Sequence, residues 1–584
     1  MSQEATTKKR PILQRLSLPI SGDKLLMVLA VLTVTYLIGI PLLADIFAAF
    51  RGPVDRLPFE ESAHFTLQNF VSAYKERDSL AIMKDTAMFA GGAVALASVI
   101  GFTLAYLVER TDIPFRNGIF VLALVPIMMP PIVVALAWIF LLGENNGLLN
   151  VAIRGALRLD GSGPFDIFTF YGMIWVQGLT MSSLGFLLLS ASLKSMDSSL
   201  EEASSASGAS TLNTLRRVTL PILRPSVLST LVLLFILAIE AFDVPLVLGA
   251  RTKVFANSVY FALNPVGDFP RYGEVAALSL SFLTFTYMLF FIYSHLTRQA
   301  NRFATITGKG YRPKRFALGA WKYPALVMVG LFGLVQFVFP LFILLWASLL
   351  DRFAPPAVDQ LQFLSLTAYR EVFSDGAFYL ALKNTFIVAI GAASIVAFFS
   401  AIVAWIVVRS KMRGKRLLDL LASSSVAVPS VIAAVAFLIF YFTISRWVPI
   451  YGTIWVLVLA YSFRFSLAYR INSAGIVQLG KELEEASLAS GASMLETLRR
   501  VIMPLLAPSM FIGFILIFFL AFRDFTMALL LGSQDNKMLS VMVWNALQSG
   551  DMGSAAAFSI LIVVILGAAI AILRGLVLPR IRGF

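Results

Sequence analysis

The amino-acid sequence contains no cysteine and only two histidines, which excludes some kinds of chemistry at once. Without cysteine, the chain can build neither a disulfide framework nor a thiolate metal site. His64 and His295 lie far apart in the chain, so they do not form a clustered imidazole site. We therefore expect no resident metal site.

A phosphate-binding loop for nucleotides is also missing from the sequence. The pattern G-x-x-x-x-G-K-[ST] does not occur, and the segment "TGKG" at Thr307 lacks the first glycine of that pattern. No nucleophile is paired with a base in a recognisable motif. We therefore expect no catalytic residues, no directly bound cofactor and no enzyme activity in the chain itself.

Charged residues are scarce as well, at 14% of 584 residues, whereas 58% of the residues are hydrophobic. Ordinary soluble domains are about 25% charged and 45–50% apolar. Twelve apolar stretches have roughly the 20 residues that a helix needs to span a bilayer. They lie near residues 25–48, 86–107, 118–142, 167–190, 226–249, 274–297, 324–349, 384–408, 418–442, 450–472, 509–531 and 555–574. The sequence thus predicts an all-α integral membrane protein with 12 transmembrane helices.

The positive charges indicate how these helices are oriented. The first apolar run is too long for a cleaved signal peptide and is interpreted as a retained helix. Lys and Arg are concentrated in the segments that an even count of spans places in the cytoplasm. Both termini are thus expected in the cytoplasm, and the long loops near 50–83 and 350–383 are expected outside. The net charge of +14 then reflects contact with the anionic inner leaflet rather than with nucleic acid.

One polar segment occurs twice in the chain. "EEASSASGASTLNTLRRVTLPILRP" begins at Glu201, "EEASLASGASMLETLRRVIMPLLAP" begins at Glu484, and 18 of the 25 positions are identical. Other stretches also match, such as "AYLVER" at Ala105 with "AWIVVR" at Ala404. The sequence therefore predicts a tandem duplication of a six-span unit. An even number of spans makes the two halves parallel, related by an axis along the membrane normal.

The duplication divides the chain into four parts. They are a cytoplasmic N-terminal segment (1–24), a first half (25–297), a basic cytoplasmic linker (298–323) and a second half (324–584). The duplicated segments cover residues 201–225 and 484–508, and each lies between the fourth and fifth spans of its half. Both segments are therefore expected at the cytoplasmic surface.

Each duplicated segment is expected to form two short helices around a glycine. Gly208 or Gly491 interrupts the first helix, and the prolines from Pro221 and Pro504 onward are expected to end the second. The first helix contains Ala, Ser and Gly, and so offers no large apolar anchor for a lipid surface. Docking into a cleft of a peripheral protein explains the segment better than lipid anchoring does.

The pattern E-E-A-x-x-x-x-G, followed by L/M-P, resembles the cytoplasmic loop motif of permease subunits of binding-protein-dependent ABC importers. In that family a short coupling helix of this loop lies in a groove of the ATPase subunit. The resemblance covers nearly the whole chain and implies two tandem six-helix permease halves of the type I importer fold. The partners it implies are two ATPase subunits, which hold ATP and Mg, and one periplasmic or lipid-anchored substrate-binding protein. The implied location is the bacterial cytoplasmic (inner) membrane.

The resemblance also implies which residues couple to the ATPase. These are Glu201, Glu202, Ala203, Gly208, Pro221, Glu484, Glu485, Ala486, Gly491 and Pro504. Glu202 and Glu485 resemble the acidic residues that contact the ATPase, and the two glycines resemble the turn between the helices. Ser204 and Ser487 depart from the alanine that is more usual in the family.

Ionisable residues inside apolar spans are candidates for the transport pathway. They are Glu240, Asp243, Arg464, Arg523 and Asp524. Glu240 and Arg523 are equivalent positions at the offset of 283 residues that relates the duplicated segments. We therefore expect these two side chains to interact near the axis in one transport state and to help close the pathway. A purely structural pairing is the alternative interpretation.

The segments "EAFDVPLVLGA" at Glu240 and "FRDFTMALLLGS" at Phe522 resemble the fused permeases of ferric iron importers. Those belong to the same broad group as thiamine, polyamine, sulfate and phosphonate permeases. The resemblance implies ferric iron as the cargo, with these other solutes as alternatives. A 12-span secondary transporter shares the topology, but the loop motif expected after its second span is absent and it has no need of the duplicated segment.

Overall fold

The computed structural model of the protein describes residues 22–52, 57–76, 78–196, 199–249, 252–265, 269–303, 315–410 and 414–581. These residues are almost entirely helical, with one small antiparallel pairing of β1 (Arg51–Gly52) with β2 (His64–Phe65). Residues 1–21 of the predicted N-terminal segment and 304–314 of the predicted linker lie outside the described residues. The predicted all-α class is confirmed.

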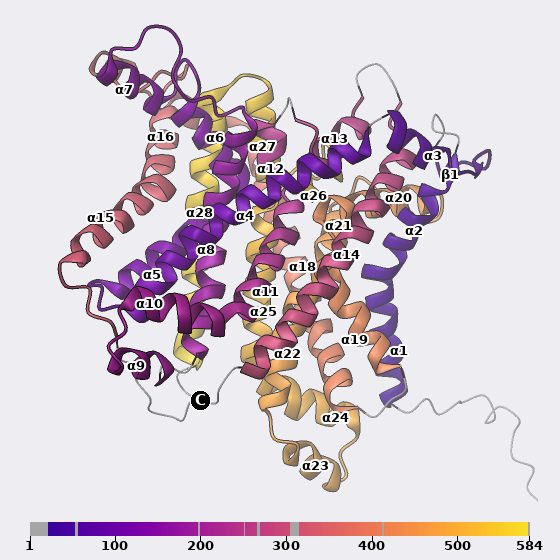
Figure 1. Ribbon diagram of the computed structural model, residues 1–584. Helices are drawn as coiled ribbons and strands as arrows, with labels where there is room; N and C mark the ends of the chain where they lie inside the picture. Colours follow the sequence, from indigo (N-terminus) through magenta and orange to yellow (C-terminus); the bar gives the residue numbers. More distant parts are fainter. Residues whose placement is uncertain are drawn as a thin grey trace, which may run out of the picture.

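The helices of the first half follow one another from the lower right of Figure 1 across the molecule. They are α1 (Gly22–Val34), η2 (Thr35–Gly39), α2 (Ile40–Ala49), α3 (Gln68–Val71), η3 (Ser72–Glu76), α4 (Ser79–Arg110), α5 (Arg116–Leu124), η4 (Val125–Met128), α6 (Pro131–Leu142), α7 (Leu148–Leu157), α8 (Phe170–Ser195), α9 (Ser199–Ala206), α10 (Thr211–Thr214), η5 (Leu215–Thr219), α11 (Leu220–Ile239), α12 (Asp243–Leu248), α13 (Phe255–Leu263) and α14 (Tyr272–Phe303).

The second half largely repeats this order. Its helices are η6 (Gly319–Trp321), α15 (Lys322–Gly333), η7 (Leu334–Val338), α16 (Phe339–Ala347), η8 (Val358–Phe363), α17 (Thr367–Ser374), α18 (Gly376–Arg409), α19 (Lys415–Ser424), η9 (Ser425–Ala427), α20 (Ser430–Ile444), α21 (Ile454–Ser462), α22 (Phe465–Gln478), α23 (Glu482–Ala489), α24 (Met494–Thr497), η10 (Leu498–Ile502), α25 (Met503–Arg523), α26 (Thr526–Leu530), α27 (Leu539–Gln548) and α28 (Met552–Ile581).

Nine of the described helical segments are long and apolar enough to cross a membrane, and three further pairs of helices are bent at a short break. The breaks bend the chain by 97° between η4 and α6, by 113° between η9 and α20, and by 48° between α21 and α22. Counting each bent pair as one span gives 12. The chain thus has nine to 12 candidate spans in two similar series.

The two sharpest bends coincide with prolines in the third span of each half. Pro130 immediately precedes α6, Pro131 is its first residue, and Pro429 immediately precedes α20. Proline has no N–H and its ring clashes with the carbonyl four residues earlier, so a helix does not continue straight through it. The third span of each half is therefore broken at its prolines.

Glycines allow α4 and α8 to pack closely within the first half. A Cβ atom on Gly101 would lie 2.7 Å from the backbone nitrogen of Phe186, and one on Gly178 would lie 2.8 Å from Leu96. Small residues at such interfaces are how helices approach each other in a membrane. Each half thereby forms a packed unit that can position its polar residues.

The two halves pack against each other through equivalent pairs of helices. The α2 helix of the first half packs against α20 of the second, and α16 of the second half packs against α6 of the first. At these contacts the hydroxyls of Tyr36 and Tyr441 lie 3.1 Å apart, and the rings of Phe140 and Phe353 lie 4.3 Å apart. The first span of each half thus lies on the third span of the other.

A pseudo-two-fold axis passes between α12 and α26. Phe242 and Phe525, which differ by 283 residues, have ring centroids 5.9 Å apart. The next pair with the same offset, Asp243 and Thr526, is joined by a hydrogen bond of 3.3 Å from the threonine hydroxyl. Residues that touch their own equivalents mark a two-fold axis, because only there does a surface meet itself.

The duplicated segments lie at one end of the molecule. Figure 1 shows α9 and α23 at the bottom, where α1 starts and α28 ends, whereas α3, α7 and α13 lie at the top. The two segments are well separated from each other in this view. This arrangement agrees with an even number of spans in each half.

Candidate functional site

The duplicated segments have the same fold in both halves. In the first copy Gly208 lies between α9 and α10, and in the second Gly491 lies between α23 and α24. Their φ angles are +82° and +87°, in the left-handed region. Residues with a side chain adopt that region at a cost of about 1–2 kcal/mol. The predicted helix–glycine–helix arrangement is therefore confirmed in both copies.

Hydroxyl groups hold the two short helices of each segment together. The Oγ atoms of Ser204 and Thr214 lie 2.9 Å apart, and those of Ser487 and Thr497 are separated by the same distance. An alanine at either serine position would remove this hydrogen bond. The departure from the family's usual alanine thus has a structural role, which sequence reasoning missed.

Each second helix begins at a serine N-cap. The Ser210 hydroxyl accepts the N–H of Asn213, and the Ser493 hydroxyl accepts the N–H of Glu496. The Glu496 carboxylate in turn accepts the Ser493 N–H at 2.9 Å, which completes a capping box. Hydrogen bonds from the backbone and hydroxyl of Ser493 lower the pKa of the Glu496 carboxyl. The start of this helix is thus more tightly specified in the second copy.

The second helix of each segment does not end at the prolines, contrary to the prediction, and continues as the fifth span. One helical stretch runs from Thr211 through η5 and Pro221 to Ile239. The turn before Pro221 is π-helical in the first copy, and the turn before Pro504 is π-helical in the second. The wider turn accommodates the proline ring and its missing N–H. The second helix of each duplicated segment is thereby continuous with a fifth span.

A buried arginine anchors the first copy to the end of α4. Arg110 Nε lies 3.0 Å from Glu201 Oε2, and both side chains are at most 3% exposed. Arg110 also donates to the backbone carbonyl of Leu193 at 2.8 Å, and Thr219 donates to Glu201 at 2.6 Å. Glu201 therefore points into its own chain.

The second copy has the equivalent anchor. Arg409, at the end of α18, lies 3.3 Å from Glu484 and donates to the backbone carbonyls of Ile476 and Leu479. Sequence reasoning missed both arginines, although the matching stretches "AYLVER" and "AWIVVR" end at or beside them. Of the ten predicted coupling residues, Glu201 and Glu484 thus fix the segments to the permease body.

The other predicted coupling residues lie at the surface of the segments. Ala203, Gly208, Pro221, Glu485, Ala486, Gly491 and Pro504 are exposed, and Glu202 is half-buried. Two large apolar side chains at equivalent positions are exposed beside them, Leu212 at 72% and Leu495 at 50%. Each copy therefore presents a small, partly apolar surface around its glycine turn.

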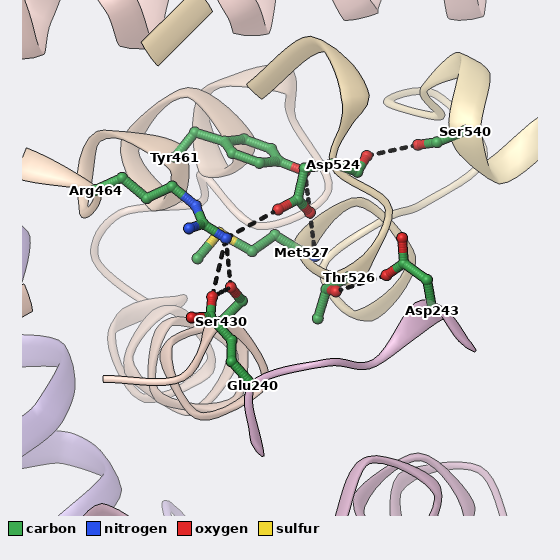
Figure 2. A network of polar contacts seen from close by, with 9 residues as sticks. All are labelled: Glu240, Asp243, Ser430, Tyr461, Arg464, Asp524, Thr526, Met527 and Ser540. Carbon is green, nitrogen blue, oxygen red and sulfur yellow. Dashed lines mark hydrogen bonds and ion pairs between the residues drawn. The ribbon is translucent and has the colours of Figure 1, made fainter. Parts of the chain in front are cut away.

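Four of the five predicted pathway residues, all except Arg523, gather near the axis in what we call the axial network. Figure 2 shows its nine residues. They are Glu240, Asp243, Ser430, Tyr461, Arg464, Asp524, Thr526, Met527 and Ser540. They come from both halves: from the ends of the fifth spans, from the short helices α12, α26 and α27 that follow these spans, and from the breaks of the ninth and tenth spans.

Arg464 is the centre of this network. It lies at the bend between α21 and α22, where its Nη2 atom is 3.1 Å from Glu240 of the first half and 3.4 Å from Asp524 of the second. Tyr461 donates to Asp524 at 2.9 Å, and Ser430 donates to Glu240 (Figure 2). One guanidinium thus joins the two halves through two carboxylates.

The expected direct pair of Glu240 with Arg523 is not formed in this structure. Glu240 binds Ser430 and Arg464, whereas Arg523 donates to the backbone carbonyl of Ile127 in η4. Each of the two equivalent residues therefore contacts the broken third span of the opposite half. Equal offset in sequence places the residues symmetrically about the axis, but it does not bring them together.

Four aromatic rings cover the axial network on the side of α13 and α27. Phe242, Phe525, Tyr260 and Trp544 form a closed circuit of contacts, with ring centroids 5.9 to 6.3 Å apart. A cavity of about 280 Å³ adjoins Tyr260 and Trp544. The described residues include no group of three or more His, Cys, Asp or Glu side chains placed to hold a metal ion. These rings thus bring together side chains from both halves beside Asp243 and Asp524.

The fold and these sites define a membrane permease built from two similar halves. The chain belongs to the family of binding-protein-dependent transport system inner membrane components, whose pattern it matches over residues 94–302 and again over 393–583. It is thus a permease subunit of an ABC importer, a multi-pass protein of the inner membrane. The resemblance noted in the duplicated segments is confirmed.

Two of the curated relatives match about four fifths of the chain, and another matches about half of it. The ferric transport system permease protein FbpB of Actinobacillus pleuropneumoniae is 30% identical, over 82% of this chain and 69% of that protein. The putative ferric transport system permease protein FbpB 1 of Haemophilus influenzae is 27% identical, over 82% of this chain and 76% of that protein. The trehalose/maltose transport system permease protein MalF of Thermococcus litoralis is 27% identical over 46% of this chain and 91% of that protein.

Proposed function

We propose that this chain alone forms the membrane pathway of an ATP-driven importer of ferric iron. The observation that carries the proposal is the double match to the family pattern, because one permease relative corresponds to about half of this chain. The reciprocal packing of the halves around one axis supports it. In this proposal the chain has 12 spans, six in 25–297 and six in 324–584, joined by the linker 298–323.

Two copies of an ABC ATPase subunit are the proposed partners at the end that carries α9 and α23. Each ATPase subunit would receive one duplicated segment, which is called a docking segment from here on. Leu212 or Leu495 would be the apolar contact of that segment. ATP and Mg would be held by those subunits. Because α10 and α24 continue into the fifth spans, a movement of the ATPases would reach the axial network directly.

This end is proposed to face the cytoplasm, together with both termini. A single cysteine at Ser210 or Ser493, both exposed, is then expected to react with a membrane-impermeant maleimide only from the inside. A cysteine at Ser62, which is exposed at the opposite end, serves as the matched control and is expected to react from outside. The reverse labelling pattern would contradict the proposed orientation.

A periplasmic or lipid-anchored binding protein is the proposed partner at the opposite end. It would meet the outer loops near 50–83 and 350–383, which occupy equivalent places in the two halves. The ion pair of Glu61 with Arg446, 3.3 Å apart and highly exposed, already links the loops of opposite halves there. Two pseudo-equivalent platforms suit a protein with two lobes.

Ferric iron is proposed as the cargo because two relatives that match 82% of the chain have names that specify ferric transport. Iron in this state prefers hard oxygen ligands. The axial network supplies carboxylates, hydroxyls and a phenol, yet the described residues hold no preformed metal cage. The cargo would therefore pass the network without a resident site, and the binding protein would select it.

The proposal is tested with the chain, its ATPase and its binding protein reconstituted in liposomes. ATP-dependent uptake of radioactive iron is expected, and unlabelled thiamine, polyamine, phosphonate or sulfate is expected not to compete. Liposomes with an ATPase that cannot hydrolyse ATP are the control. Uptake of one of those solutes in place of iron would reassign the cargo while leaving the permease class intact.

A further inference from the structure

The two equivalent residues of opposite charge, Glu240 and Arg523, each contact the break in the third span of the opposite half. We propose that each of these two residues is a charged cap for the broken third span opposite to it. The caps are positioning residues: they hold the chain at the two breaks in place and release it when the fifth spans move. This inference rests on the proposed import function for its direction of movement. The geometry of the caps does not depend on the identity of the cargo.

Arg523 completes a carbonyl that its own helix cannot satisfy. In a regular helix, the Ile127 carbonyl would accept a hydrogen bond from the N–H four residues later, or three residues later in a tighter turn. Those positions are Pro131 and Pro130, and proline has no N–H. Arg523 reaches across from α25 and donates to this carbonyl. A cation is also favoured there by the negative end of the helix dipole.

Glu240 lies at the opposite kind of helix end, where it contacts the side chain of the first helical residue. The position equivalent to Pro131 in the second half is Ser430, which begins the 15-residue helix α20. The N-terminal end of a helix presents free N–H groups and a positive dipole, both of which favour a carboxylate. Ser430 donates its hydroxyl to Glu240, and Arg464 holds the same carboxylate oxygen. The carboxylate is thus matched to the start of α20.

The sign of each cap therefore follows from the residue opposite to it. Where the break ends in two prolines, the fifth span of the other half carries a guanidinium. Where the helix after the break begins with a serine, the other fifth span carries a carboxylate. This cross-matching between the halves explains why equivalent positions bear opposite charges without pairing with each other.

The caps connect the docking segments to the breaks. Glu240 follows α11 and Arg523 ends α25, and both helices are continuous with the second helices of the docking segments. When an ATPase shifts a docking segment, its fifth span would pull the cap off the opposite third span. An uncapped charge is costly unless water reaches it, so release would accompany hydration of the passage.

A charge swap separates this inference from a direct ion pair. In the reconstituted complex, Glu240→Gln and Arg523→Gln are each expected to lower cargo transported per ATP hydrolysed by about tenfold. The swapped chain, Glu240→Arg with Arg523→Glu, is expected to be no better than either, because a carboxylate would then face the Ile127 carbonyl. Recovery of more than half of the wild-type ratio by the swap would overturn the caps in favour of a direct pair.

Chemical modification repeats the test on protein that has already folded. The chain has no cysteine, so Glu240→Cys and Arg523→Cys each introduce a single thiol. A cationic methanethiosulfonate is expected to restore Arg523→Cys and an anionic one to restore Glu240→Cys, with the opposite reagents inactive. The Cys-free chain in the same complex controls for thiols of the partners.

The quantity that the reagents should restore to its wild-type value is the rate of ATP hydrolysis without binding protein. This measurement needs no cargo. Reagents of either charge having equal effects would overturn the inference. Absence of iron uptake with charge-dependent ATP hydrolysis intact would instead reject only the proposed cargo.

Discussion

The two halves of the chain agree in their docking segments and differ at the axis. In both docking segments a left-handed glycine, an arginine–glutamate anchor and a 2.9 Å pair of hydroxyls recur. At the axis Pro131 corresponds to Ser430, and the unbroken α8 corresponds to the bent α21–α22, which places Arg464 in the network.

This difference reflects the partner surface that each region contacts. The docking segments, in the proposed importer, meet two copies of the same ATPase, so the same surface serves in both halves. The axial residues of one half meet those of the other, so they are complementary instead of alike. The two halves thus keep the same surface toward the ATPases and differ where they contact each other.

Changing the glycine turn of either docking segment is expected to have the largest effect. Proline fixes φ near −65°, which is incompatible with the values of +82° at Gly208 and +87° at Gly491. Gly208→Pro or Gly491→Pro should therefore lower ATP-dependent transport at least about tenfold while the chain still inserts. Gly161→Pro is the matched control, because Gly161 has φ +88° in a loop at the opposite end. Equal loss from all three variants would mean that the turn has no special link to the ATPase.

Removing each arginine anchor tests whether the two anchors contribute equally to the stability of the chain. Arg110→Met leaves the buried Glu201 without its ion pair, which should destabilise the chain by about 3–5 kcal/mol. Arg409→Met should cost less, because the Glu484 side chain is 12% exposed and water can reach it. Thermal unfolding in detergent measures the difference.

The control for the anchors is a surface ion pair. Arg446→Ala breaks the highly exposed pair with Glu61 and should change stability by only about 0–1 kcal/mol. A larger loss for Arg409→Met than for Arg110→Met would contradict the role assigned to burial.

The hydroxyl pairs are expected to make the smallest and most nearly equal contributions. Thr214→Val and Thr497→Val keep the side-chain shape but remove one hydroxyl, at a cost of about 1 kcal/mol each. Hydrogen exchange of α9 and α23 should rise to a similar extent in the two variants. Ser205→Ala, at an exposed position of α9, is the control and should leave exchange unchanged. A change confined to one copy would show that the segments differ more than their geometry indicates.

Much of this architecture could be predicted because it depends on local sequence. Apolar length identified the spans, and the repeated motif identified the docking segments. The continuation of the docking helices past Pro221 could not be foreseen, because a π-helical turn absorbs the proline and leaves no sequence signal of comparable strength.

Contacts between the halves were the least predictable feature. The offset of 283 residues identified Glu240 and Arg523 as equivalent, but equivalent residues touch only on the axis itself. Phe242 lies there and meets Phe525, whereas Glu240 lies two residues earlier and meets the opposite third span. The role of Arg464 depends on the bend between α21 and α22, which the unbroken α8 of the first half does not share.

The central claim is that one chain supplies both halves of a permease around a single axis. Cysteines at Asp243 and Thr526, equivalent residues whose side chains are 3.3 Å apart, provide the most direct measurement. With a protease site placed in the linker, oxidation of this otherwise Cys-free chain should hold the two fragments together on a denaturing gel. The account predicts an intramolecular cross-link that blocks transport until it is reduced. A cross-link between two separate chains, or none at all, would contradict it.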